Sequence, residues 1–405
     1  MDWRRMRPVT IVIGCMIGLS LNIVPAFSTT FTVFMKPMAA DLGWTRTQLV
    51  LGSSVASAAV AVAVWPVGWL IDRYSPRSII LFGIPLFGSA MASLALVPAS
   101  FASYILICTL IGITAAGCFH TVYISLLVTH FDKKVGLALG TTIAGAAVGQ
   151  VVLPSYSRYL IDGFGWREAY VLLALTIVVI GWANAWLLPS GTAKTPTGRS
   201  EPKDQPGITP RDALRSLIFW RLLLCYLLLG AFAGGHLVSL VPLLTDRGIS
   251  PTVATAMFGL IGFSSIVARL ATGYFLDRMN AGLLGVVTFG VGISGAVLLI
   301  ISNNPVTVMI AISAIGVMVG AESDLAVYIT LRLFGRRFFG TINAIVYSSL
   351  LVGILTGPLV FSLSFDEYGS YLPGEWLIIG GALVACIMHF NILSNARTEF
   401  RLTRH

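Results

Sequence analysis

The sequence predicts an all-α membrane protein whose twelve transmembrane helices form two similar bundles of six. Three observations predict this fold class. The mean hydropathy is +0.87 and only 11% of the residues are charged, which is unlike a soluble domain of this length. Twelve apolar runs are each long enough to cross a hydrocarbon layer about 30 Å thick. The two halves of the chain also repeat one another.

The apolar runs are separated by short polar connections. They cover residues 9–35, 46–71, 77–98, 102–129, 135–161, 167–189, 217–244, 252–276, 281–302, 305–331, 338–363 and 373–394. The first run follows Arg4, Arg5 and Arg7 and has no small-residue cleavage site. We therefore interpret it as a transmembrane helix and not as a removed signal. All five cysteines lie inside apolar runs, so we expect core residues without disulfides.

Basic residues gather in alternate connections, which is the pattern that orients membrane proteins. One side carries residues 73–77, 133–134, 194–221 and 332–337, together with both termini. The positive-inside rule then predicts that both termini are cytoplasmic, in a cell (inner or plasma) membrane. The net charge of +9 belongs to this pattern, and we exclude nucleic acid as a partner.

The two halves are joined by a polar segment, residues 190–213, with the composition of a flexible linker. We predict six-helix bundles at 1–189 and 214–405. DLGWT at 41–45 corresponds to DRGIS at 246–250, and GWLIDR at 68–73 corresponds to GYFLDR at 273–278. A duplicated six-helix unit is typical of transporters that bind their substrate near the membrane midplane between two halves.

The repeated Asp-Arg loops predict a cytoplasmic gate. An acidic residue at a helix end can pair with the end of a neighbouring helix when the cytoplasmic side is closed, and release it on opening. The candidate gate residues are Asp72, Arg73, Arg77, Asp277 and Arg278. The alternative is that these residues only hold the turns and set the topology.

Several motifs carry a resemblance to known transporters. GWLIDRYSPR at 68–77 resembles the loop motif of the major facilitator superfamily, although Ser75 and Pro76 replace its usual glycine position. Within that superfamily, the segments 31–49, 236–250, 262–278, 320–335 and 353–358 resemble monocarboxylate transporters and their bacterial relatives, including the oxalate:formate antiporter group. The resemblance implies the major facilitator fold, alternating access and a small organic carboxylate as substrate.

Arg269 is the one charge within the apolar run that begins at Pro251. It lies about 12 Å inside the membrane by helical rise, where a guanidinium needs a polar cavity or a carboxylate. Ser265 lies one turn away on the same stripe. By resemblance, Arg269 matches the arginine that binds substrate carboxylate in monocarboxylate transporters. The alternative is a structural ion pair with Glu322 or Asp324.

Two departures from the resemblance bear on mechanism and substrate. The animal transporters carry an acidic residue where this chain has Ser265, and a lysine where it has Thr29, so their proton-coupling pair is missing. The oxalate:formate group carries a second cation on the eleventh helix, but residues 343–351 contain no Lys or Arg. A single fixed cation favours a substrate with one carboxylate.

Other polar residues inside the runs complete the candidate site. Glu322 and Asp324 lie about 200° apart around one helix, so one is expected to carry a proton or balance Arg269 while the other braces helices. Asn22 and Thr29, seven residues apart, share a face of a helix that Pro25 is expected to kink. Further candidate ligands are His120, His236, Asn343 and Tyr347. Each histidine has the alternative of a structural helix–helix bond.

The sequence therefore predicts a secondary transporter for an organic monocarboxylate, coupled to protons through Glu322. An anion exchanger without a proton step and a transport-inactive membrane sensor are the alternatives. No nucleotide loop, metal-spaced cluster or nucleophile–base pair is present, so neither an enzyme nor a cofactor is expected. The expected partners are the carboxylate, protons and the lipid bilayer, and the expected state is a monomer.

Overall fold

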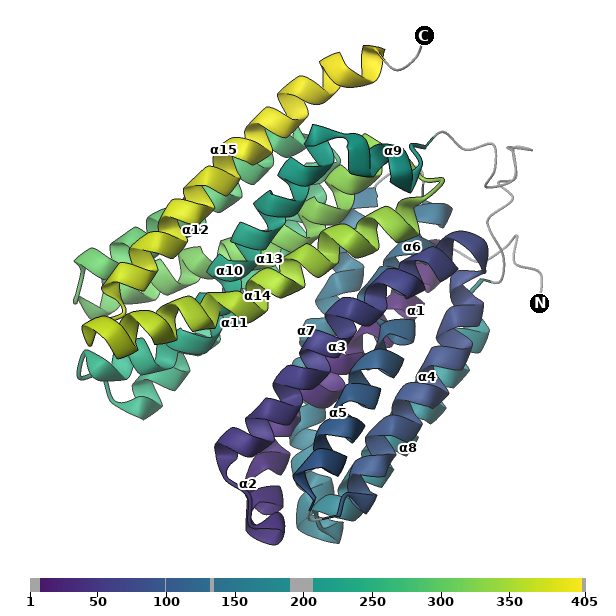
Figure 1. The fold of residues 1–405 in the computed structure, drawn as a ribbon, viewed down its shortest axis with the longest axis vertical. Coiled ribbons are helices and arrows are strands. Elements are labelled where there is room, and N and C mark those ends of the chain that lie inside the picture. The colour runs from purple at the N-terminus through teal and green to yellow at the C-terminus, as the bar shows by residue number, and fades with distance from the viewer. Residues whose placement is uncertain (1–7, 99, 132–134, 190–206, 403–405) are drawn as a thin grey trace. The chain divides into compact units, whose positions relative to one another are not determined.

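The computed structural model describes residues 8–98, 100–131, 135–189 and 207–402, which form almost only helices (Figure 1). Within these ranges, twelve helical segments are long and apolar enough to cross a membrane, as predicted. Most of the predicted linker, residues 190–206, lies outside the described residues. From Gly207 the chain is described again and forms a short helix, α9 (Pro210–Arg215).

In the first half, three of the six spans include a short π- or 3₁₀-helix, labelled η. The six spans are α1 (Pro8–Ser20) with η2 (Val24–Thr29) and α2 (Phe31–Leu42), α3 (Arg46–Arg73), α4 (Pro76–Ala92) with η3 (Ser93–Leu96), α5 (Phe101–Ala115) with η4 (Ala116–Cys118) and α6 (His120–His130), α7 (Val135–Phe164), and α8 (Trp166–Leu187). Those of the second half are α10 (Leu217–Asp246), α11 (Pro251–Leu276), α12 (Ala281–Ile301), α13 (Pro305–Phe334), α14 (Phe339–Tyr368) and α15 (Leu372–Leu402).

Local sequence signals set the helix starts. Thr45 and Gln48 form a reciprocal capping box at the start of α3, which satisfies two free backbone N–H groups. The side chain of Asn304 accepts hydrogen bonds from the first turn of α13. Proline occupies an early position of α4, α11 and α13, where its missing N–H costs nothing. These signals explain why the predicted and observed starts agree closely.

The first span is interrupted at the predicted kink. Pro25 lies in the π-helix η2, and the Asn22 side chain accepts a hydrogen bond from the backbone of Val24 at 2.9 Å. Thr29 donates to the Val24 carbonyl at 2.9 Å. Because a π-helix holds more residues per turn than an α-helix, the seven-residue spacing of Asn22 and Thr29 does not put them on one face by helical periodicity. The polar side chains instead satisfy the broken backbone.

The chain divides into two compact units. Unit 1 comprises Met1–Lys133, Thr141–Gly207 and Arg336–Ala344, and unit 2 comprises Lys134–Gly140, Ile208–Gly335 and Ile345–His405. Each unit thus includes the start of a helix from the other half of the sequence, α14 in unit 1 and α7 in unit 2. The predicted boundaries at 189 and 214 concern the two sequence halves and stay a prediction.

Glycines allow backbones to touch inside both units. In unit 2, a Cβ atom at Gly353 or Gly357 of α14 would meet a carbonyl oxygen of α10. In unit 1, the same holds for Gly145 and Gly149 of α7 against α1. This is the small-residue packing expected of membrane helices.

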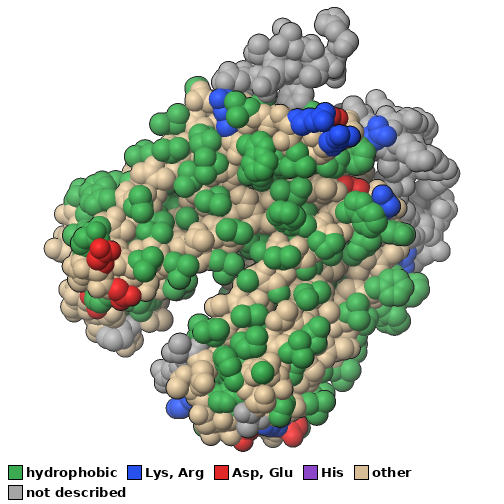
Figure 2. All heavy atoms as spheres, in the orientation of Figure 1, with side chains coloured by type: hydrophobic (Ala, Val, Ile, Leu, Met, Phe, Trp, Pro, Cys, Tyr) green, Lys and Arg blue, Asp and Glu red, His purple; other side chains and the backbone are tan. Residues whose placement is uncertain are grey.

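Large apolar side chains are also exposed along the helices. Phe82, Val62 and Phe263 are each at least 70% exposed, and hydrophobic side chains spread over the flanks of the helices in Figure 2, where the coloured charges gather near helix ends. Such surfaces suit contact with lipid.

Candidate functional site

The packing of α11 against α13 determines where Arg269 points. Gly316, Gly320 and Asp324 recur every four residues on α13, so they share one face. A Cβ atom at Gly320 would meet the carbonyl oxygen of Ser265 on α11. Because the backbones touch at that level, the residue one turn further along α11, Arg269, lies opposite Asp324.

Arg269 forms an ion pair through one nitrogen of its guanidinium, Nη1. Its Nη1 donates to the Ser323 hydroxyl at 2.9 Å and to Asp324 Oδ1 at 3.2 Å. Asp324 is fully buried, whereas the Arg269 side chain is 17% exposed. Within the described ranges, no protein group accepts a hydrogen bond from Nε or Nη2. The predicted alternative of an ion pair with Asp324 is therefore present, and the second edge of the guanidinium is available to another anion.

Glu322 belongs to the same cluster but has different neighbours. It is 4% exposed, and its carboxylate interacts electrostatically with Arg269, with Tyr226 of α10 and with Tyr347 of α14. No donor among the described residues reaches its Oε2. Of the two acids, Asp324 is the one that accepts a hydrogen bond from Arg269 in the described contacts, while Tyr347 interacts electrostatically with both. Asp324 balances Arg269, while Glu322 is left without a dedicated cation.

His236 lies beside an acid that the sequence reasoning did not select. Its Nε2 is 3.9 Å from Oε1 of Glu375 in the first turn of α15. Its Nδ1 contacts the carbonyl of Phe232 at 2.8 Å. An acid in the first turn of a helix also complements the helix dipole. The sequence therefore carries no signal that marks Glu375 as a partner of His236. His236 therefore has a specific partner outside the Arg269 cluster.

The candidate ligands of the first half lie in unit 1. His120 is buried at the start of α6, with its ring edge-on to Phe119. Asn22 and Thr29 bind the backbone around η2. Asn343, in the part of α14 that belongs to unit 1, is 1% exposed, and no described group bonds its side-chain amide. Tyr347, one turn further along α14, falls in unit 2 with Arg269.

The two gate aspartates bind helix starts in matching ways. In unit 1, Asp72 accepts hydrogen bonds from the backbone N–H groups of Gly340 and Thr341 at 2.8 and 2.9 Å, and from the Thr341 hydroxyl. In unit 2, Asp277 accepts from the N–H groups of Gly136 and Leu137 at 2.9 and 3.0 Å. A carboxylate at a helix N-terminus satisfies free donors and complements the helix dipole.

The basic gate candidates have other partners. Arg77 is 7% exposed and donates to the carbonyls of Ala185 and Trp186 at 3.1 and 2.8 Å, at the end of α8. Arg73 stacks on the ring of Trp69, and Arg278 stacks on that of Tyr274. In the described contacts, the helix starts are thus bound by the aspartates.

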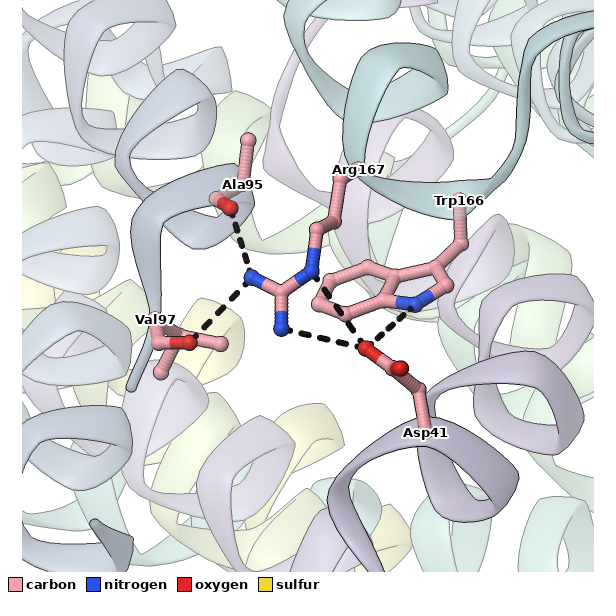
Figure 3. Close-up of polar contacts among 5 residues, drawn as sticks. All are labelled: Asp41, Ala95, Val97, Trp166 and Arg167. Carbon is pink, nitrogen blue, oxygen red and sulfur yellow. Dashed lines mark hydrogen bonds and ion pairs between the residues drawn. The ribbon is translucent and has the colours of Figure 1, made fainter. Parts of the chain in front are cut away.

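A further polar cluster fixes the other end of unit 1 (Figure 3). Asp41 at the end of α2 accepts hydrogen bonds from Trp166 Nε1 at 3.2 Å and from Arg167 Nη2 at 3.1 Å. Nη1 of Arg167 donates to the carbonyls of Ala95 and Val97. One guanidinium therefore joins the ends of α2 and η3 to the start of α8. These contacts are a structural connection between helix ends.

Spanning helices, a duplicated sequence and ionisable groups buried inside the spans together define a class. Buried charges of this kind mark the pathway of a substrate or ion through the membrane. The protein is a membrane transporter.

Comparison with known proteins gives the family. A model described as Major Facilitator Superfamily matches residues 15–358. Monocarboxylate transporter 13 of Bos taurus is 23% identical over 392 residues, covering 92% of this chain and 87% of that protein. Monocarboxylate transporter 11 of Homo sapiens is 26% identical over 354 residues, covering 82% and 73%. The chain belongs to the major facilitator superfamily.

Solved structures agree with the fold. The E. coli fucose:proton symporter FucP superposes with a TM-score of 0.71 at 12% identity, covering 95% of this chain and 99% of that one. The human organic anion transporter MFSD10 superposes with a TM-score of 0.72 at 14% identity, covering 95% and 100%. Membership of the major facilitator superfamily and the twelve candidate spans among the described residues make this a multi-pass membrane protein of a family that transports small molecules, which fits the expectation of a non-enzyme.

Proposed function

We propose that the protein carries an organic monocarboxylate across the cell membrane by alternating access, together with a proton. The observation that supports this most is that only Nη1 of the Arg269 guanidinium donates hydrogen bonds in the described contacts. Nη1 donates to Ser323 and Asp324. The Nε–Nη2 edge has the geometry to donate two parallel hydrogen bonds to a carboxylate. Relatives named monocarboxylate transporters over most of their length support the same substrate class.

Charge balance assigns the proton to Glu322. With both acids ionised, the empty cluster of Arg269, Asp324 and Glu322 carries one net negative charge. A bound monocarboxylate adds a second one, which is costly in a buried site. A proton that binds Glu322 restores the original net charge. Substrate and proton thus enter and leave together without changing the charge of the cluster.

The aspartates at the helix starts supply the gate in this proposal. Asp72 and Asp277 hold the starts of α14 and α7 in the structure, and both sets of hydrogen bonds must break when the cytoplasmic side opens. The candidate ligands for the uncharged part of the substrate stay His120, Asn22, Thr29, Ser265, Asn343 and Tyr347. The seventh candidate, His236, faces Glu375 instead. Both termini are cytoplasmic in the proposed orientation, and the transporter acts as a monomer.

Glu322→Gln in proteoliposomes tests the coupling. We use radiolabelled acetate, lactate and benzoate as monocarboxylates, and oxalate as the dicarboxylate control. The variant is expected to lose accumulation driven by a pH gradient while counterflow continues. If accumulation and counterflow are both unchanged, the protein is an anion exchanger without a proton step. If the wild type moves none of the three monocarboxylates, the substrate proposal is wrong.

A further inference from the structure

His236 and Glu375 form a second buried ionisable pair, separate from the Arg269 cluster. The two side chains are 2% and 0% exposed, and they join the middle of α10 to the first turn of α15. Among the described residues, neither oxygen of Glu375 accepts a hydrogen bond, and Nε2 of His236 has no hydrogen-bond partner. A buried carboxylate without a donor is expensive, so this pair needs an explanation.

The hydrogen bond on the far side of the imidazole fixes the tautomer. Nδ1 of His236 lies 2.8 Å from the carbonyl oxygen of Phe232. A carbonyl oxygen only accepts, so Nδ1 must carry the proton. In the neutral ring, Nε2 is then a bare acceptor. It faces Glu375, whose ionised carboxylate is also only an acceptor. Two acceptors therefore face each other unless a proton is shared between them.

The surroundings keep water and other charges away from this position. The imidazole contacts the ring of Phe232 with a centroid separation of 4.3 Å and the ring of Phe361 at 5.6 Å. A Cβ atom at Gly235 would lie 2.7 Å from the Phe361 ring, so the glycine before His236 makes room for that ring. The environment favours a net neutral pair, and neutrality requires one added proton.

The other titratable groups on the packed elements are already accounted for. Arg269 of α11 pairs with Asp324, and Glu322 of α13 interacts with Arg269 and Tyr226. Tyr371, just before α15, stacks on Phe365 and makes a tilted ring contact with Phe361. Burial, with the carboxylates of Asp246 and Asp366, raises the pKa of the Tyr371 phenol, so it stays neutral near pH 7. In the described part of the chain, His236 has no ion-pair partner besides Glu375.

We propose that His236 and Glu375 are a proton-binding site: one added proton, on Nε2 or on the carboxylate, replaces two facing acceptors by a donor and an acceptor and so joins α10 to α15. When the proton leaves, the bare carboxylate faces a bare nitrogen and the contact between the helices weakens. The site gives the transporter a response to pH that does not depend on which substrate is carried. It goes beyond the proposed function and stands even if the substrate is not a monocarboxylate.

Thermal unfolding of the purified full-length protein at a series of pH values tests the site without any substrate. The wild type is expected to unfold at lower temperature as the pH rises, because loss of the added proton leaves two acceptors facing each other. In Glu375→Gln the amide N–H₂ donates to Nε2 without a titrating proton, so much of this fall should disappear. The control is Glu367→Gln, an exposed acid at the end of α14, which should keep the wild-type dependence.

Nitrogen NMR of histidine-labelled protein gives a second reading. The signal of His236 is the one missing from His236→Gln. In the wild type, Nδ1 should be protonated throughout while the Nε2 signal changes with pH, and Glu375→Gln should abolish that change. If Glu375→Gln keeps the wild-type pH dependence of unfolding and of the Nε2 signal, the proposal is wrong. Glu322→Gln should leave the Nε2 signal of His236 unchanged, which separates this site from the proposed coupling residue.

Discussion

The unequal hydrogen bonding of the two gate aspartates predicts unequal effects of their removal. Asp72 accepts three hydrogen bonds and Asp277 accepts two. At about 1.5 kcal/mol for each bond to a charged acceptor, Asp72→Ala removes about 4.5 kcal/mol and Asp277→Ala about 3 kcal/mol. The difference of about 1.5 kcal/mol corresponds to about a tenfold larger shift in the equilibrium that releases the helix start.

Hydrogen–deuterium exchange measures how often the backbone N–H groups at these helix starts are released. Peptides that contain Gly340 and Thr341 report on the start of α14, and peptides that contain Gly136 and Leu137 report on the start of α7. Exchange should accelerate by about three decades in Asp72→Ala and about two decades in Asp277→Ala.

Thr341→Val isolates the extra bond, because it removes the hydroxyl donor and keeps both backbone N–H groups on the carboxylate of Asp72. It should accelerate exchange at the start of α14 by about tenfold. Equal acceleration in the two aspartate variants, or none in Thr341→Val, would refute the assignment of the bonds.

Three further predictions follow from burial and packing. Arg269→Gln leaves the buried Asp324 carboxylate without its cation and should cost about 3–5 kcal/mol of stability; adding Asp324→Asn should restore the unfolding temperature but not uptake into liposomes. Gly357→Leu should abolish folded protein on size-exclusion chromatography, since its Cβ meets a carbonyl oxygen of α10, whereas Gly259→Ala, with open space around it, should behave as wild type. Arg167→Gln should lower stability by about 1–3 kcal/mol because carbonyls of Ala95 and Val97 lose their donor, while Arg158→Gln, which breaks only an exposed pair, should change it by at most about 0.5 kcal/mol.

The spans could be predicted because crossing a membrane needs a long apolar run whatever its neighbours are. The run 305–331 corresponds to α13 at Pro305–Phe334. The first run was predicted to end at 35, yet α2 continues to Leu42, because Lys36 and Pro37 are tolerated inside the helix. A charge near the end of a span can extend toward the membrane surface, so charge is a weak signal for where a helix ends.

Pairings between helices were harder to predict than the helices themselves. The Asp-Arg motif predicts that Asp72 binds a helix end, but only the folded chain shows that the end belongs to α14. The ion pair of Arg269 with Asp324 does have a signal, since Gly316, Gly320 and Asp324 mark one close-packed face of α13. Without knowing that this face packs on α11, the sequence does not show which of Glu322 and Asp324 pairs with Arg269.

Anchoring of the substrate by Arg269 is tested most directly by carboxylate binding to purified protein. We would titrate acetate, lactate and benzoate, with chloride as the control anion, and follow the unfolding temperature of Asp324→Asn and of Arg269→Gln/Asp324→Asn. Both proteins lack the Asp324 carboxylate, so they differ only in the guanidinium. A carboxylate that stabilises the first should bind the second about 100-fold more weakly, for two lost charge-assisted bonds. Equal stabilisation of both proteins would contradict the anchor.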